Sequence, residues 1–176
     1  EDNLCRRVAD GPLAPGLLGY NRDLPGGFGP DLVAHPARLV SVPDHVPDER
    51  AVLTEPLAVA VHGLGILLKH GMSGKLLIIG VGSIGLLALE AARRLGFSGT
   101  VTVVARYSVQ AAFAKSRGAD QVFGSVEQAA KAVGAHSYRA MIGLRAWRGG
   151  YDLVIDAAGS RSSLEQAVWA VREGWR

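Results

Sequence analysis

Cysteine is nearly absent from the chain, with a single residue, Cys5, among 176. One thiol excludes an internal disulfide framework and is typical of a reducing compartment, so we expect a cytoplasmic location. Aromatic residues are also scarce, at 6%. The chain also has no large excess of one charge sign, because its net charge is only +3 and its charged residues are scattered. We therefore expect no nucleic-acid partner.

Long hydrophobic runs are missing as well. The longest uncharged apolar stretch, Leu76–Leu89, is shorter than a membrane span and contains a glycine turn, so we expect no membrane partner. The composition, 48% hydrophobic and 20% charged, is that of a globular protein, and 176 residues are enough for one domain with a core and a fragment of a second. The chain begins at Glu1 without an initiator methionine and stops at Arg176 just after a helical pattern. We expect a piece of a longer protein.

A glycine-rich turn follows the apolar run Leu76–Ile79, which is typical of a strand buried on both faces of a parallel sheet. Gly80 permits a tight turn, Gly82 lets the backbone approach a pyrophosphate, and Gly85 lets the next helix pack closely. The first turn of that helix offers unpaired N–H groups to an anion. The predicted cofactor contacts in this turn are Gly80, Gly82, Ser83, Ile84 and Gly85.

Strands alternate with helices after this turn, which predicts an α/β doubly wound parallel sheet. The expected strands are Leu76–Ile79, Thr100–Ala105, Gln121–Phe123 and Tyr151–Ala157, and the later helices are Val109–Arg117, Val126–Val133 and Ser163–Arg172. We expect the spatial order 3-2-1-4 in a Rossmann sheet. The segment Gly134–Gly150 is interpreted as a helix plus a loop.

The first 47 residues are rich in glycine and proline and predict loops with short strands at Leu32–Ala34 and Arg38–Val42. This is too little material for an independent core. Asp48 is expected to cap a short helix through Leu53. Glu55-Pro56 then opens a longer helix that ends near Gly71, with proline at its first position.

Five motifs occur in the order that a known family has them: Asn3-Leu4-Cys5, Gly26-Gly27-Phe28, the helix from Glu55-Pro56 to His62, Gly118-Ala119-Asp120, and Val154 to Gly159. Together they cover nearly the whole chain. The chain resembles the medium-chain dehydrogenase/reductases, specifically the zinc-dependent alcohol and polyol branch. This resemblance is specific for the family and unspecific for the substrate.

The resemblance implies a remnant of a GroES-like β domain at 1–54, a linking helix at 55–74 and a truncated Rossmann domain at 75–176. It implies an NAD(P)-dependent oxidoreductase that transfers hydride between a nicotinamide and a hydroxyl-bearing carbon of a small alcohol, polyol or sugar. Ala157, at the end of the fourth strand, is the further cofactor contact. Homo-oligomers occur in the family, but through a later strand, so oligomeric state stays open.

The resemblance also implies a catalytic zinc, which would act as a Lewis acid in a full-length parent. Most of its ligands would precede Glu1, so the fragment is not expected to turn over alone, and we assign no catalytic residue. Glu55 matches a zinc ligand or a close neighbour of one, and is equally explained as a first-turn helix residue. Cys5 corresponds to one structural-zinc thiolate and, without partners, is interpreted as a free thiol. His62 is expected to pack against the cofactor domain.

The identity of the cofactor depends on the end of the second strand. About twenty residues past the glycine turn, NAD sites place an acid that binds the ribose hydroxyls. Ala105 holds that place here, and Arg106 follows it. An arginine can grip a 2′-phosphate by charge-assisted hydrogen bonds, so we favour NADP, with NAD as second choice. If Arg106 only stacks on the adenine, the preference would be weak.

Two further interpretations stay open. The chain could be a non-catalytic nucleotide-binding or assembly module that kept the Rossmann half and lost its zinc site. A methyltransferase with a similar glycine turn fits less well, because such proteins usually carry an acid where Ala105-Arg106 stands.

Overall fold

The computed structural model describes residue 19 and residues 26–32, 34, 36, 39–71, 73–139 and 145–172. The chain divides into two compact units, Glu1–Val46 and Pro47–Arg176. The second unit contains all the named helices and strands. The division at 54 and 74 that the resemblance implies stays a prediction.

The helices of the second unit are α1 (Asp48–Ala51), α2 (Thr54–Leu67) with the 3-10 turn Leu68–His70, α3 (Ser83–Arg94), α4 (Ser108–Ser116), α5 (Val126–Ala132) and α6 (Arg161–Ala170). The strands are β1 (Lys75–Ile79), β2 (Thr100–Val104), β3 (Gln121–Phe123), β4 (His136–Arg139), β5 (Arg145–Arg148) and β6 (Leu153–Asp156). Each strand and helix predicted after the glycine turn is found within two residues at either end, except over 134–150.

Four strands form one parallel sheet in the order β3-β2-β1-β6. Ile79 at the end of β1 pairs with Val104 of β2 and with Asp156 of β6, so the carboxyl ends of the three strands are level. The chain runs from β1 outward to β3 and then returns to the other side of β1. This confirms the predicted doubly wound fold and the order 3-2-1-4.

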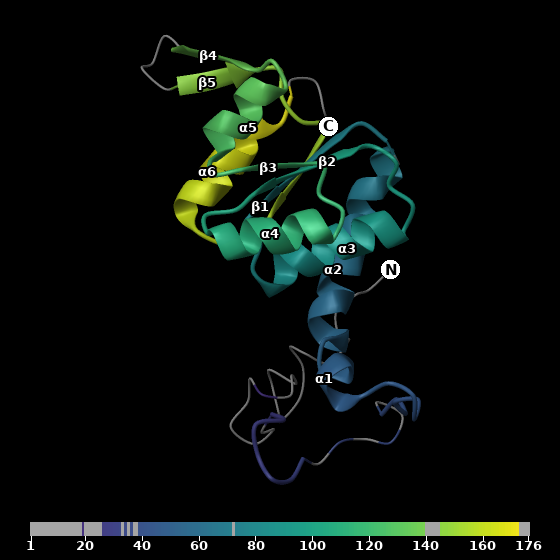
Figure 1. The fold of residues 1–176 in the computed structure, drawn as a ribbon. Helices are drawn as coiled ribbons and strands as arrows, with labels where there is room; N and C mark the ends of the chain where they lie inside the picture. Colours follow the sequence, from purple (N-terminus) through teal and green to yellow (C-terminus); the bar gives the residue numbers. More distant parts are fainter. Residues whose placement is uncertain are drawn as a thin grey trace. The chain divides into compact units, whose positions relative to one another are not determined.

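Helices cover both faces of the sheet, with α2, α3 and α4 on one face and α5 and α6 on the other (Figure 1). The alternation of side chains along a strand explains this arrangement. Leu76 and Ile78 pack toward α2 and α3, whereas Leu77 and Ile79 pack toward α5 and α6. All four are buried. An unbroken apolar strand is therefore what a sheet covered on both faces requires.

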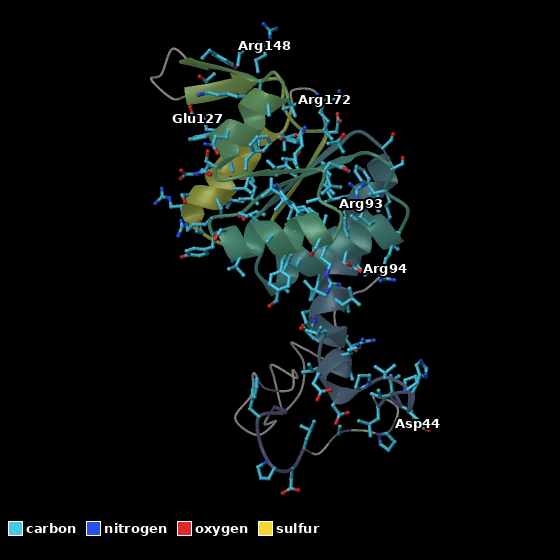
Figure 2. The ribbon with its side chains drawn as sticks, in the orientation of Figure 1. Asp44, Arg93, Arg94, Glu127, Arg148 and Arg172 are labelled. Carbon is cyan, nitrogen blue, oxygen red and sulfur yellow. The ribbon has the colours of Figure 1, made fainter. Side chains whose placement is uncertain are left out.

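Arg93, in the last turn of α3, makes contacts with residues outside its own helix. The Arg93 guanidinium donates to the carbonyl oxygens of Phe97, Gly99 and Gly118, and it pairs with the carboxylate of Asp120. Arg94, its neighbour in sequence, pairs with Glu90 on the same helix. Figure 2 shows the two arginines diverging from the end of α3. Arg93 thus ties α3 to the segments that open β2 and β3.

The interpretation of Gly134–Gly150 as a helix plus a loop is wrong. This segment forms the antiparallel pair β4 and β5, separate from the main sheet. Gly134 has φ +78° and stops α5, since its N–H and that of Ala135 turn back to bond the last carbonyls of the helix. The four-residue strands are too short for their alternation to stand out from a helical period.

Three smaller expectations also need correction. Within the described part of Glu1–Val46 no strand forms at Leu32–Ala34 or Arg38–Val42, and Leu39, Val40 and Val42 are exposed. Asp48 does not cap α1; Pro47 holds the cap position and Asp48 is the first helical residue. The long helix opens at Thr54, which places Pro56 third in the helix, where its missing N–H costs no hydrogen bond.

The helical stretch Asp48–Leu67 is long and apolar enough to cross a membrane by length and composition, with a mean hydropathy of 1.3. One such helix is weak evidence, because core helices of soluble proteins pass the same test. Ala60 and Leu64 of this stretch are buried in the core of the unit, and 11% of its apolar window is buried in all. No membrane role follows from it.

Candidate functional site

The turn from β1 into α3 depends on two glycines for its shape. Gly80 has φ +86°, and a Cβ there would lie 2.9 Å from the Cβ of Ala158 and 3.0 Å from its backbone nitrogen. A Cβ on Gly85 would overlap the carbonyl oxygen of Gly80. Gly80 and Gly85 are therefore required by the backbone path and by the close packing of α3 on β1.

The middle glycine has no such structural reason. Gly82 has φ −75° and ψ −166°, which any residue adopts, and a Cβ there would meet nothing within 4 Å. The fold would accept a larger side chain at this position. A glycine here leaves bare backbone facing open space, which is what the close approach of a ligand requires.

The amino end of α3 is exposed at Ser83 and Ile84. The first helical hydrogen bond of α3 is donated by the Leu86 N–H to the carbonyl oxygen of Gly82. The N–H groups of Ser83, Ile84 and Gly85 therefore lack a partner within the helix and sum with its dipole. No acidic residue lies in the first turn. This end of α3 can receive a phosphate, with the Ser83 hydroxyl beside it.

Ala105 and Arg106 follow β2 at the same edge of the sheet. Ala105 is buried and its N–H bonds to the carbonyl oxygen of Phe123, so its side chain belongs to the core rather than to a ligand surface. Arg106 is exposed, and it makes no side-chain hydrogen bond or ion pair with any residue that the structure describes. Its guanidinium is available to an anion beyond the end of β2.

The loop after β6 is tied together by Asp156. Its Oδ1 accepts hydrogen bonds from the N–H groups of Ala158 at 3.0 Å and Gly159 at 3.3 Å. Its Oδ2 accepts from the hydroxyl of Ser163, which is buried, at 3.0 Å. Ser160 and Ser163 also cap each other at the start of α6. In the sequence Asp156 stands out only as part of the Val154–Gly159 motif. An aspartate followed two residues later by a turn is the signal that indicates this loop.

The predicted cofactor residues of the glycine turn, Arg106 and Ala157 all lie at the carboxyl edge of the parallel sheet. Ala157 donates its N–H to the carbonyl oxygen of Ile79, and its Cβ would lie 3.4 Å from one on Gly85. The edge between β1 and β6 is the place where the winding of the chain changes direction. Open α/β sheets bind their ligands at this switch point.

Among the described residues, Tyr151 in the core has the one pKa that is clearly shifted. Burial raises the pKa of the Tyr151 phenol, although a hydrogen bond with Thr102 lowers it in part. Tyr151 is fully buried, and its hydroxyl donates to the carbonyl oxygen of Ala129 on α5 at 2.9 Å. Tyr151 therefore joins the start of β6 to α5 and takes no part in the ligand edge.

A zinc site is not completed by the described residues. Glu55 and His62 are both exposed on α2. Among the described residues no group of three or more histidine, cysteine, aspartate or glutamate side chains is close enough to hold a metal ion. Cys5, the other predicted ligand, lies outside the described residues. The residues present do not fit a zinc ion without further ligands.

A groove of about 300 Å³ borders the site on the outer face of α3. It is lined by Leu53, Ser83, Leu86, Leu87, Glu90, Phe113 and Arg117. Only Ser83 belongs to both the groove and the glycine turn, so the groove lies beside the carboxyl edge rather than on it.

Comparison with known proteins places this arrangement in a family. Galactitol 1-phosphate 5-dehydrogenase of Escherichia coli K12 is 37% identical over 115 residues, which are 65% of this chain and 32% of that protein. Human sorbitol dehydrogenase is 28% identical over 136 residues, or 76% of this chain and 35% of that protein. The chain thus spans less than half the length of these relatives.

Solved structures agree with the sequence relatives. The crystal structure of galactitol-1-phosphate dehydrogenase from E. coli matches with a TM-score of 0.64 at 29% identity, over 84% of this chain and 40% of that one. Acetophenone reductase from Geotrichum candidum, in complex with NAD, matches with a TM-score of 0.67 at 25% identity, over 97% and 46%. The family model described as zinc-binding dehydrogenase matches residues 83–175. The chain belongs to the zinc-binding dehydrogenase family, within the medium-chain dehydrogenase/reductases that its sequence resembles.

Proposed function

We propose that this chain is the cofactor-binding part of an NADP-linked dehydrogenase that acts on a small alcohol, polyol or sugar. The observation that carries the proposal is the open space at Gly82, because neither backbone strain nor packing explains a glycine there. A diphosphate that rests against the bare backbone does explain it. The relatives named above as dehydrogenases of galactitol 1-phosphate and sorbitol support the polyol class.

Each residue of the carboxyl edge has a distinct part in this proposal. The diphosphate accepts hydrogen bonds from the first N–H groups of α3, with Ser83 as an added donor and Ile84 beside it. Gly80 and Gly85 hold the turn in shape, and Ala157 lines the neighbouring strand end. When bound, the nicotinamide supplies the hydride acceptor or donor. The protein's task at this edge is to bind and orient the dinucleotide.

The preference for NADP over NAD rests on Arg106. Beyond the end of β2, a dianionic 2′-phosphate would lie near the exposed cation of Arg106. An NAD site normally has a carboxylate that binds the ribose hydroxyls, and Ala105 stands at that position here. The structure of the acetophenone reductase was solved in complex with NAD, so that protein binds NAD with this fold. Arg106 is the feature that favours NADP in this chain.

Zinc belongs to the proposal only for a longer protein. Glu55 and Cys5 stay predicted ligands of a catalytic and a structural zinc, respectively, and each needs partners beyond the described residues. A cytoplasmic location and a possible homo-oligomer likewise stay proposals.

Fluorescence titration of the expressed chain with NADPH and NADH tests the proposal. The Gly82→Val variant should abolish binding while retaining the fold, because its side chain would occupy the place of the diphosphate. Gly63→Val on α2 is the matched control, since a Cβ there also meets nothing within 4 Å. It should bind as the wild type does. Unchanged affinity of Gly82→Val would refute the proposed pose.

The alternative, a non-catalytic nucleotide-binding or assembly module, shares the glycine turn and makes the same binding prediction. The parent sequence separates the two. Metal-ligating cysteine and histidine-glutamate residues upstream of Glu1 support the dehydrogenase, whereas their absence from a longer parent supports the module.

A further inference from the structure

Two ends of the proposed cofactor can be assigned to the two sides of β1. Arg106 follows β2, which lies on one side of β1, and Ala158 follows β6, which lies on the other. A dinucleotide with its 2′-phosphate near Arg106 and its diphosphate at Gly82 must continue toward the loop after β6. The nicotinamide half therefore meets residues 157–160.

The loop 157–160, which the nicotinamide half would contact, is held in place by the carboxylate of Asp156. Ala158 packs directly against the glycine turn, with its Cβ and backbone near the position that a Cβ on Gly80 would take. Asp156 bonds the N–H groups of Ala158 and Gly159 through one oxygen and the buried Ser163 hydroxyl through the other. The loop is thereby fastened both to the end of β6 and to the first turn of α6.

We propose that Asp156 is a positioning residue for the nicotinamide half of the dinucleotide. It fixes the backbone of Ala158 and Gly159 against Gly80, so that the floor of the crevice is set before the ligand arrives. Preorganisation of this kind lowers the entropy lost on binding. The inference rests on the proposed function, since it takes the dinucleotide pose as given.

Removing the carboxylate should loosen the loop and leave the sheet intact. Ala158 and Gly159 are exposed, so water can bond their N–H groups in an Asp156→Ala variant. The strand pairing of Asp156 with Ile79 is made by the backbone and is kept. We therefore expect the loss of the Asp156 carboxylate to weaken ligand binding more than it lowers the free energy of unfolding.

The chain offers a matched control at the opposite end of the same strand. Asp152 also accepts a hydrogen bond from a backbone N–H, that of Lys75 at 2.7 Å, and pairs with Arg172 at 2.9 Å. It stands just before β6, at the amino edge of the sheet. Asp152→Ala removes a comparable carboxylate without touching the proposed crevice.

The experiment compares two ligands by calorimetric titration of the full chain. NADPH carries the nicotinamide half, and adenosine 2′,5′-bisphosphate lacks it. Asp156→Ala should bind NADPH about tenfold more weakly than the wild type and bind the bisphosphate equally well. Asp152→Ala should match the wild type for both ligands. Asp156→Glu, which keeps a carboxylate, should recover part of the lost affinity.

Two outcomes would overturn the inference while sparing the proposed function: unchanged NADPH affinity in Asp156→Ala, or an equal loss for both ligands, which would indicate a merely structural role. In either case Gly82→Val would still abolish binding. If the wild type binds neither ligand, the inference and the proposed function are both wrong.

Discussion

A Cβ atom on Gly85 would overlap the carbonyl oxygen of Gly80, whereas one on Gly82 would meet nothing within 4 Å. The two glycines stand three positions apart in one turn and serve different ends. Gly85 is required by the close packing of α3 on β1. Gly82, in our account, is required by the close approach of a ligand.

This contrast predicts opposite outcomes for the same substitution. Gly85→Ala should destabilise the protein by about 3 kcal/mol, because the backbone must shift to admit a methyl group. Gly82→Ala should change the free energy of unfolding by less than about 0.5 kcal/mol. Urea denaturation measures both. Equal losses in the two variants would contradict the division of roles.

Arg93 and Arg94 should differ in the same way. Arg93→Ala removes three hydrogen bonds to backbone carbonyls and the pair with Asp120, and should cost about 2 to 3 kcal/mol. Arg94→Ala removes one exposed ion pair within a helix, worth about 0.5 kcal/mol or less. Thermal unfolding of both variants checks this. If the two variants have the same Tm, Arg93 does not stabilise the segments before β2 and β3 as described.

Tyr151 predicts how stability changes at high pH. Because burial raises the pKa of its phenol in the folded protein, the unfolded chain releases this proton first as the pH rises. The stabilising contribution is complete below about pH 10 and is lost as the pH rises from there through the higher pKa of the folded state.

Tyr151→Phe should lower stability at neutral pH by about 1 to 2 kcal/mol, since the carbonyl of Ala129 loses its donor. It should also flatten the fall in stability above about pH 10. Tyr138→Phe on β4 is the control, because that side chain is exposed. A fall in Tyr151→Phe as steep as in the wild type would show that other groups cause it.

Arg106 should decide which cofactor binds. Arg106→Glu should weaken NADPH binding roughly 100-fold, or about 2 to 3 kcal/mol, and leave NADH binding equal or better. Arg161→Glu is a matched charge reversal on α6, where the exposed Arg161 pairs with Glu165. It should leave both affinities unchanged. A wild type that prefers NADH would overturn the NADP assignment.

The fold was predictable because the local signals agreed with one another. The buried part of β1, Leu76–Ile79, is a short apolar run in the sequence, and glycines follow the helices where φ is positive. The winding order followed from the alternation of strands and helices. These features depend on neighbouring residues and need no knowledge of the tertiary structure.

The failures came where pairing over a distance decides the structure. Val40 and Val42 are good strand formers, but no strand pairs with them among the described residues, and they stay in irregular backbone. The short strands β4 and β5 exist only because they pair with each other. The hydrogen bond between Asp156 and Ser163 was not predicted, because Ser163 lies seven residues away and reaches Asp156 only through the turn into α6.

The central claim is that a diphosphate rests on bare backbone at the amino end of α3, and amide NMR tests it most directly. On titration with NADP⁺, the resonances of Gly82, Ser83 and Ile84 should shift saturably, while those of Gly63 and Gly65 on α2 stay in place. Saturable shifts confined to other segments, with these three amides unmoved, would contradict the account.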